Sequence, residues 1–238
     1  MPVLDSHAHC GLTLPFERLK PLWLKAEIEG GVLFSPVEEI YDRFDGNFID
    51  SSSYQESRDN VHCYLQSVKS ELTYVFWFVW NDFKKPGRKF SGIKWHRHAY
   101  EPHYLYGTRQ CDQLIEYICQ LRLPVILEEE FDRTREMVKI FMGRTVTIIP
   151  HFGNLNGGYY QLKRAGLFED PAVYVDTALA SSDQIEDFAA TYGTDRILFG
   201  SDFPFGDPVQ ECLKVKSLFT GTERQRILGE NLLDLLQG

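Results

Sequence analysis

Two histidines near the start of the chain, His7 and His9, have the residue type and spacing of a metal-ligand pair. They follow the apolar pair Val3-Leu4, which predicts a β-strand. Residues two apart on a strand point to the same face, so both imidazoles can reach one ion. Neutral imidazole is a common ligand of zinc and other first-row metals. Asp5 shares this face and is expected to steer the site or to hold the strand end. A His-x-His pair alone is a weak signal.

Three more metal-competent side chains end predicted strands: Glu128, His151 and Asp202. Each follows a short apolar run, which is typical of a buried parallel strand. In a (β/α)8 barrel the C-terminal tips of the strands meet at one mouth, so these groups would converge with His7 and His9 on a single metal site. Each also has a structural explanation: Asp202 can cap a turn, His151 can cap a loop, and Glu128 opens a solvated Glu-Glu-Glu run.

The elements that must position these groups alternate along the chain. Apolar runs predict eight strands and the intervening patterns predict helices, which together indicate a (β/α)8 barrel formed by one domain, 1–238. An open doubly wound sheet is the alternative, although no Gly-rich phosphate loop follows the first strand. The predicted strands are 2–7, 31–34, 72–80, 91–96, 123–128, 145–150, 172–177 and 196–201. The predicted helices are 15–28, 36–43, 55–70, 109–121, 131–142, 157–165, 182–192, 207–218 and 222–236.

Local signals support several of these boundaries. Residues 35–38, Ser-Pro-Val-Glu, predict a capping box with proline at the first helical position. Ser181 or Ser182 is expected to cap the helix that follows, and Gly193 is expected to end it. The stretch 44–54 predicts a loop over or beside the catalytic face, with solvated surface as the alternative.

Composition narrows the functional class. The chain has 238 residues, 43% hydrophobic and 25% charged, with a formal charge of −9. That charge disfavours a nucleic-acid binder, which would need a basic face. The most apolar window, 72–80, is too short to span a bilayer, and we expect no signal peptide. Five cysteines without a Cys-x-x-Cys pair predict a reducing cytoplasm rather than a disulfide framework. Cys10 is predicted to be a packing residue.

Several motifs together resemble the amidohydrolase superfamily and, within it, the amidohydrolase 2 branch, which includes aminocarboxymuconate-semialdehyde decarboxylase and related aromatic-acid decarboxylases. The motifs are Asp5-Ser6-His7-Ala8-His9, Gly92-Ile93-Lys94-Trp95-His96, Pro124-Val125, Ile149-Pro150-His151-Phe152-Gly153, 197–204 and the closing helix at 227–236. The resemblance runs nearly end to end. It implies a (β/α)8 barrel with a catalytic divalent metal, usually zinc and in some decarboxylases manganese or magnesium. It also implies that His7, His9 and Asp202 are ligands and that His151 is a base or substrate-polarising residue.

One position departs from the branch, whose fifth strand typically reads Pro-Val-x-x-His with histidine as a ligand. Here the same register ends in Glu128. A carboxylate can bind zinc at a similar distance but adds negative charge and favours harder metals. We expect either that Glu128 is a substituted ligand, which would include a bridge between two ions, or that the metal site is weakened.

Two residues of the fourth predicted strand are expected at the mouth. Lys94 is predicted to line the pocket and hold an anionic substrate group; a structural lysine reaching the barrel rim and a carboxylated metal bridge are the alternatives. His96 shares its face and is predicted to bind substrate. His98 and His103 are predicted to be surface or loop residues.

The expected function is metal-assisted hydrolysis of a small, cyclic or carboxylated molecule, with His151 or Asp202 taking the proton of water. Non-oxidative decarboxylation by the same ion is the rival chemistry, and a degenerate, metabolite-binding barrel is a non-enzymatic alternative. Zinc is the first choice of metal. Barrels of the resembled branch are frequently dimers, so a homodimer is also expected. Aromatic residues near strand ends are candidate pocket residues: Trp23, Trp80, Phe83, Trp95, Phe152 and Phe203.

Overall fold

Eight parallel strands in consecutive order form one sheet in the computed structural model, which describes residues 1–237. The strands are Val3–His9 (β1), Ile28–Phe34 (β2), Thr73–Phe78 (β3), Gly92–His96 (β4), Val125–Glu128 (β5), Thr147–Ile149 (β6), Val173–Asp176 (β7) and Ile197–Leu198 (β8). The sheet closes through the segment after β8, because the N–H of Ser6 donates to the carbonyl of Phe199 at 2.7 Å and that of His9 to Phe203 at 2.9 Å. The expected (β/α)8 barrel is confirmed, and the doubly wound alternative is wrong. The one-domain assignment stays a prediction.

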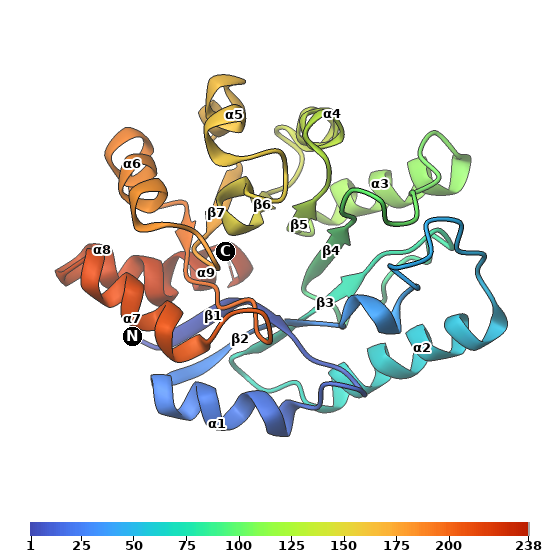
Figure 1. Ribbon diagram of the computed structural model, residues 1–238, viewed down its shortest axis with the longest axis horizontal. Helices are drawn as coiled ribbons and strands as arrows, with labels where there is room; N and C mark the ends of the chain where they lie inside the picture. Colours follow the sequence, from blue (N-terminus) through green and yellow to red (C-terminus); the bar gives the residue numbers. More distant parts are fainter. Residues whose placement is uncertain (238) are drawn as a thin grey trace.

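Helices surround the strands (Figure 1). They are Phe16–Ala26 (α1), Ser52–Ser67 (α2), Arg109–Leu121 (α3), Phe131–Phe141 (α4), Tyr159–Arg164 (α5), Ser182–Tyr192 (α6), Pro208–Leu218 (α7), Gly221–Gln225 (α8) and Asn231–Gln237 (α9). Short 3-10 turns lie at Val37–Glu39, Pro150–Gly153 and Leu167–Glu169, and a π-helical turn, Arg226–Glu230, joins α8 to α9. The predicted bounds of α3 and α6 match the structure. Over residues 1–237, no helix combines the length and apolarity needed to cross a membrane.

Capping residues in the sequence correctly predict the start of α6 but wrongly predict a helix after β2. The Ser181 side chain accepts from the N–H of Gln184, and the Gln184 side chain accepts from the N–H of Ser181, so the predicted cap is a full capping box. Gly193 ends the same helix, as expected. These bonds are local, and the Asn154 side chain, which also bonds to Gln184, leaves both of them in place.

The helix predicted at 36–43 is wrong, because only the three-residue turn Val37–Glu39 forms there. The Ser35 hydroxyl donates to the carbonyl of Pro36 instead of capping a helix. The Glu39 carboxylate turns inward and accepts from the N–H groups of Leu12 and Thr13 at 3.0 and 2.7 Å. These hydrogen bonds between Glu39 and the loop after β1 outweigh the local preference of residues 36–43 for a helix. The expected loop 44–54 ends early, since α2 starts at Ser52.

The inside of the barrel is apolar at one end and polar at the other. Leu232 of α9 packs with apolar side chains of the strands, including Leu4, Phe76 and Ile148, so α9 covers the end where the strands begin. Buried polar side chains gather where the strands finish: His7, His9, Lys94, His96, Glu128 and Asp176. Parallel β/α barrels carry their chemistry at this second end.

Candidate metal centre

His7 and His9, at the end of β1, are each oriented by an acceptor behind the ring. The Nδ1–H of His7 donates to Oδ2 of Asp176 at 2.8 Å, and that of His9 donates to the carbonyl of Ser35 at 3.0 Å. Because both acceptors lack a proton to give, they place the proton on Nδ1 and leave the Nε2 lone pair free. Such outer partners fix the tautomer and ring orientation of metal-binding histidines.

His151, after β6, is held in the same manner. Its Nδ1–H donates to the carbonyl of Ala178 at 3.1 Å, and its backbone N–H donates to Oδ1 of Asp176 at 2.9 Å. Asp176, at the tip of β7, therefore holds both His7 and His151. The backbone of His151 has φ 55°, a left-handed conformation that is costly for a residue with a side chain. This conformation lies at the residue whose ring joins the other metal-competent side chains.

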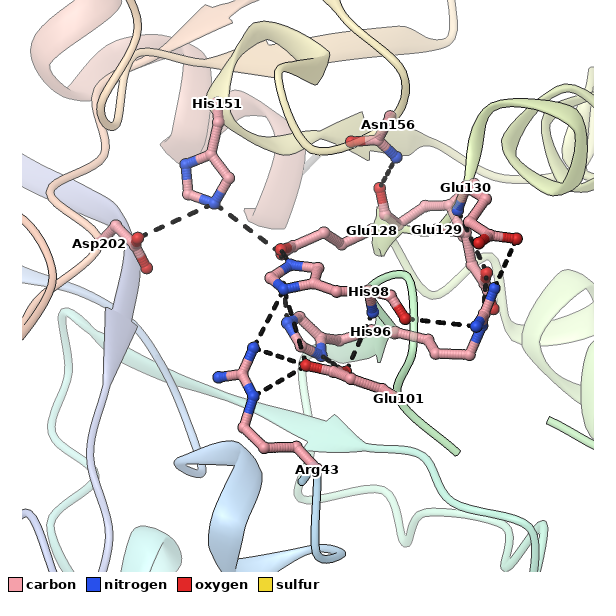
Figure 2. A network of polar contacts seen from close by, with 12 residues as sticks. Arg43, His96, His98, Glu101, Glu128, Glu129, Glu130, His151, Asn156 and Asp202 are labelled. Atoms are coloured by element: carbon pink, nitrogen blue, oxygen red, sulfur yellow. Dashed lines mark hydrogen bonds and ion pairs between the residues drawn. The ribbon is translucent and has the colours of Figure 1, made fainter. Parts of the chain in front are cut away.

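Asp202, after β8, faces these rings. Its Oδ1 lies 3.4 Å from Nε2 of both His7 and His9, and its Oδ2 lies 3.9 Å from Nε2 of His151. Figure 2 shows Asp202 and His151 pointing toward one another. Two imidazole nitrogens and one carboxylate oxygen, all buried and within 4.8 Å of one another, form a donor set that suits a divalent transition metal. The residues present thus fit the ion that the sequence predicts.

Protonation states at this point favour metal binding. Burial lowers the pKa of His7 from 6.5 to about 4, so the ring is neutral at physiological pH. Burial alone would raise the pKa of Asp202, but the neighbouring imidazoles of His9, His7 and His151 outweigh burial and lower this pKa to about 2. Neutral imidazole and ionised carboxylate are the forms that bind metal ions.

A second donor set joins His7 with Glu128 and His151, but it already contains a cation. The Nζ of Lys94 lies 2.7 Å from Oε2 of Glu128 and 3.4 Å from Nε2 of His7. Burial raises the pKa of Glu128, yet Lys94 and His96 outweigh burial and bring this pKa well below its ordinary value. Glu128 is therefore an ionised, fully buried carboxylate bonded to a lysine.

A third grouping, His96, His98 and Glu101, serves as scaffold. Oε1 of Glu101 accepts from Arg43 at 2.6 and 2.8 Å, and Oε2 accepts from the Tyr41 hydroxyl at 2.8 Å and from the N–H of His98 at 3.0 Å. Figure 2 shows Arg43 against His98 and Glu101. A carboxylate that already satisfies four donors has little capacity left for a metal ion.

A cavity of about 180 Å³ opens onto these groups. It is lined by His9, Val37, Arg43, His96, His98, Glu128, His151, Leu155, Leu179, Asp202 and Phe205. A larger hollow of about 630 Å³ lies near α1 and the start of β2, at residues such as Phe16, Lys20 and Ile28. That hollow contains none of the three donor sets, so the smaller cavity is the better candidate for chemistry.

The structure brings the five predicted ligands, His7, His9, Glu128, His151 and Asp202, to one end of the barrel, with Lys94 and His96 beside them. His103 is exposed and lies in a loop, as expected. His98 was expected at the surface or in a loop; it lies in a loop, but its ring lines the cavity and its Nε2 contacts Oε1 of Glu128.

Sequence reasoning missed Asp176, Arg43 and the inward turn of His98. Asp176 carried the same signal as Asp202, an acidic residue at the tip of a predicted strand. Arg43 and His98 lie in irregular segments, where sequence periodicity gives no direction. Asp5 holds the strand end, because its carboxylate accepts from Trp23 and from the N–H and hydroxyl of Ser201.

Comparison with solved structures shows the same fold over the whole chain. An amidohydrolase 2 from Bifidobacterium longum subsp. infantis is 17% identical, with a TM-score of 0.69 and coverage of 100% of this chain and 99% of that one. The 2,6-dihydroxybenzoate decarboxylase from Rhizobium is 13% identical, with a TM-score of 0.72 and coverage of 100% and 99%. A putative 2-pyrone-4,6-dicarboxylic acid hydrolase from Pseudomonas putida is 17% identical, with a TM-score of 0.72 and coverage of 99% and 97%. No curated protein matches the chain.

The family is shown by sequence rather than by these distant structural likenesses. The amidohydrolase family model, amidohydrolase 2, matches residues 86–236, well over half of the chain. The matched region contains Glu128, His151, Asp176 and Asp202, while the His7-x-His9 pair lies before it. The chain therefore belongs to the amidohydrolase 2 family.

Proposed function

We propose that the chain is a divalent-metal-dependent hydrolase of a small carboxylated molecule, with His7, His9 and Asp202 as the protein ligands of one ion. One observation carries this proposal: Oδ1 of Asp202 lies 3.4 Å from Nε2 of each histidine, inside a buried site that opens to a cavity. Zn²⁺ suits the two imidazoles best, with Mn²⁺ or Mg²⁺ as harder alternatives. Held by these residues, Zn²⁺ would lower the pKa of a coordinated water toward about 7 and would polarise the carbonyl of the substrate.

His151 is the proposed base. The carbonyl of Ala178 holds the proton on Nδ1, so Nε2 is left to accept a proton in the direction of Asp202. Burial lowers the pKa of His151, but Glu128, Asp176 and Asp202 outweigh burial and raise this pKa above 6.5. A base of this strength is matched to proton transfer near neutral pH. Asp202, which the sequence also predicts as a catalytic residue, steadies the imidazolium that forms.

The cavity supports a small anionic substrate. Its volume of about 180 Å³ limits the substrate to a small molecule, and the guanidinium of Arg43, which also pairs with Glu101, is the cationic group on its lining. His96 also lines the cavity and stays a predicted substrate-binding residue. Its pKa is lowered by burial from 6.5 to about 4, so its ring is neutral. Lys94 is completely buried and engaged by Glu128, which favours a role inside the site over contact with substrate.

The test is a substrate panel on metal-loaded protein: carboxylated lactones, amides and hydroxybenzoates, followed for acid release and for CO2. We expect hydrolysis of a carboxylated lactone or amide, lost in His151→Asn but kept in the exposed-histidine control His103→Asn. Release of CO2 without a hydrolysis product would replace this proposal with decarboxylation.

Metal content separates both activities from a degenerate barrel. We expect about one ion per chain after expression with zinc or manganese, and a higher Tm when metal is added to stripped protein, because an ion that binds only the folded chain stabilises it. Less than about 0.1 ion per chain with no change in Tm would show that the barrel does not retain a resident metal.

A further inference from the structure

Lys94 is an unusual residue to find inside a metal-binding cluster. Its side chain has no exposed surface, and its ammonium lies 4.7 Å from the centre of the Phe34 ring. It bonds to two of the three members of the second donor set, Glu128 and His7. A buried lysine needs a counter-charge and hydrogen-bond acceptors, and this donor set supplies both.

We propose that the Lys94 ammonium fills the position of a second metal ion, so that the barrel mouth binds one divalent cation where its donors would otherwise bind two. This inference rests on the proposed function, because it takes the first ion at His7, His9 and Asp202 as given. It also gives Glu128 a role: its Oε2 is the counter-ion of Lys94 rather than a ligand of the first ion.

The geometry at His7 and Glu128 shows why a second metal ion and the Lys94 ammonium exclude one another. Nδ1 of His7 is used by Asp176, so the ring has one lone pair left, on Nε2. That nitrogen lies 3.4 Å from the Lys94 ammonium and 3.4 Å from Asp202. With the first ion on His7, Lys94 keeps Glu128 as its acceptor. A second ion would have only Glu128 and His151 of the second donor set as protein donors, and it would have to displace Lys94 from Glu128.

Charge balance leads to the same count. The buried carboxylates of Glu128, Asp176 and Asp202 with the Lys94 ammonium leave two negative charges, which one divalent cation neutralises. A second divalent cation beside Lys94 would leave two uncompensated positive charges in a buried site, which is strongly unfavourable. Removing the Lys94 charge lowers that excess to one positive charge and frees Oε2 of Glu128 for the second ion.

The test counts ions in Lys94→Gln by elemental mass spectrometry, after expression and dialysis with Mn²⁺ or Zn²⁺. We expect about one ion per chain in the wild type and about two in Lys94→Gln, with a spin-coupled Mn²⁺ pair in its electron paramagnetic resonance spectrum. The double variant Lys94→Gln/Glu128→Gln should return to one ion and also shows that the mutated site can fold. Lys84→Gln is the matched control, because Lys84 also pairs with a carboxylate, Asp59, at 2.8 Å, but at the surface.

Each outcome decides between the two proposals. One ion in both the wild type and folded Lys94→Gln, or two ions in the wild type, overturns the role of Lys94. No ion in the wild type but one gained in Lys94→Gln overturns the metal-dependent function and keeps Lys94 as the stand-in cation. Glu128→Ala should keep its single ion and lose thermal stability, since Lys94 is left unpaired. If Glu128→Ala loses the ion, Glu128 is a ligand and the inference fails.

Discussion

Two buried histidines in different parts of the molecule show how a candidate metal ligand differs from a packing residue. His7 lies at the polar end of the barrel, with Nδ1 bonded to Asp176 and Nε2 directed at the other donors. His62 lies on α2 outside the barrel, where its ring stacks on Trp77 at 3.7 Å and its Nε2 accepts from the N–H of Phe78 at 3.2 Å.

Burial and pKa do not distinguish the two residues. His7 and His62 are both less than 4% exposed, and burial lowers the pKa of both, to about 4 and about 3. The distinction is what Nε2 contacts, because a lone pair already used by a backbone N–H cannot bind an ion. In this chain a buried, neutral histidine therefore indicates a site only where its second nitrogen is not bonded to the backbone and faces other metal-binding side chains.

The largest effect is expected from Asp202→Asn. It removes the carboxylate that joins His7 and His9, so bound metal should fall below about 0.1 ion per chain. Hydrolysis should fall about 1000-fold or more, the scale seen when a group essential to the chemistry is removed. Elemental analysis and kcat/KM measure the two losses. His62→Gln is the control and should keep both metal and activity; loss of metal in His62→Gln would remove the distinction between the two histidines.

An intermediate effect is expected from Asp176→Asn, which alters the acceptor behind His7 and leaves every proposed ligand in place. Replacing such an outer partner typically weakens metal affinity 10–100-fold. Competition with a chromogenic chelator would measure the change in Kd. Asp187→Asn is a suitable control, because Asp187 is a half-buried carboxylate on α6 that pairs with Lys163 and belongs to none of the donor sets. Unchanged affinity in Asp176→Asn would mean that orientation of the His7 ring does not depend on this carboxylate.

The smallest effect is expected in how the free energy of unfolding of the metal-free protein depends on pH through His62. His62 has a pKa of about 3 when folded and about 6.5 when unfolded, so between these values the unfolded chain binds the extra proton. The wild type should therefore lose stability relative to His62→Gln as pH falls from about 6.5 toward 4, by up to about 1.4 kcal/mol per pH unit. Urea unfolding of both proteins in chelator at pH 7, 6, 5 and 4 would measure this difference. A constant difference across that range would show that His62 is not buried as a neutral ring.

Much of the fold follows from short-range pattern. The apolar runs that end in Glu128, His151 and Asp202 predict β5, β6 and the segment after β8, because parallel strands in a barrel are covered on both faces. Boundaries fail where a distant contact competes with a local signal, as at Ser35, where Glu39 turns inward to hold the loop after β1. The sequence also identifies the end of the barrel where the proposed ligands gather, because strand tips in this architecture share one mouth.

By itself, then, the sequence determined the barrel, the family and the set of metal-competent residues, because residue type and the two-residue period of a strand are local properties. Tertiary structure alone decided which nitrogen of each histidine faces the other metal-competent side chains. It also decided that Asp176 accepts hydrogen bonds from both His7 and His151, and that Glu128 is bonded to Lys94. Those contacts join residues from different strands. Their distances depend on how the whole barrel closes, and no periodicity within one strand encodes them.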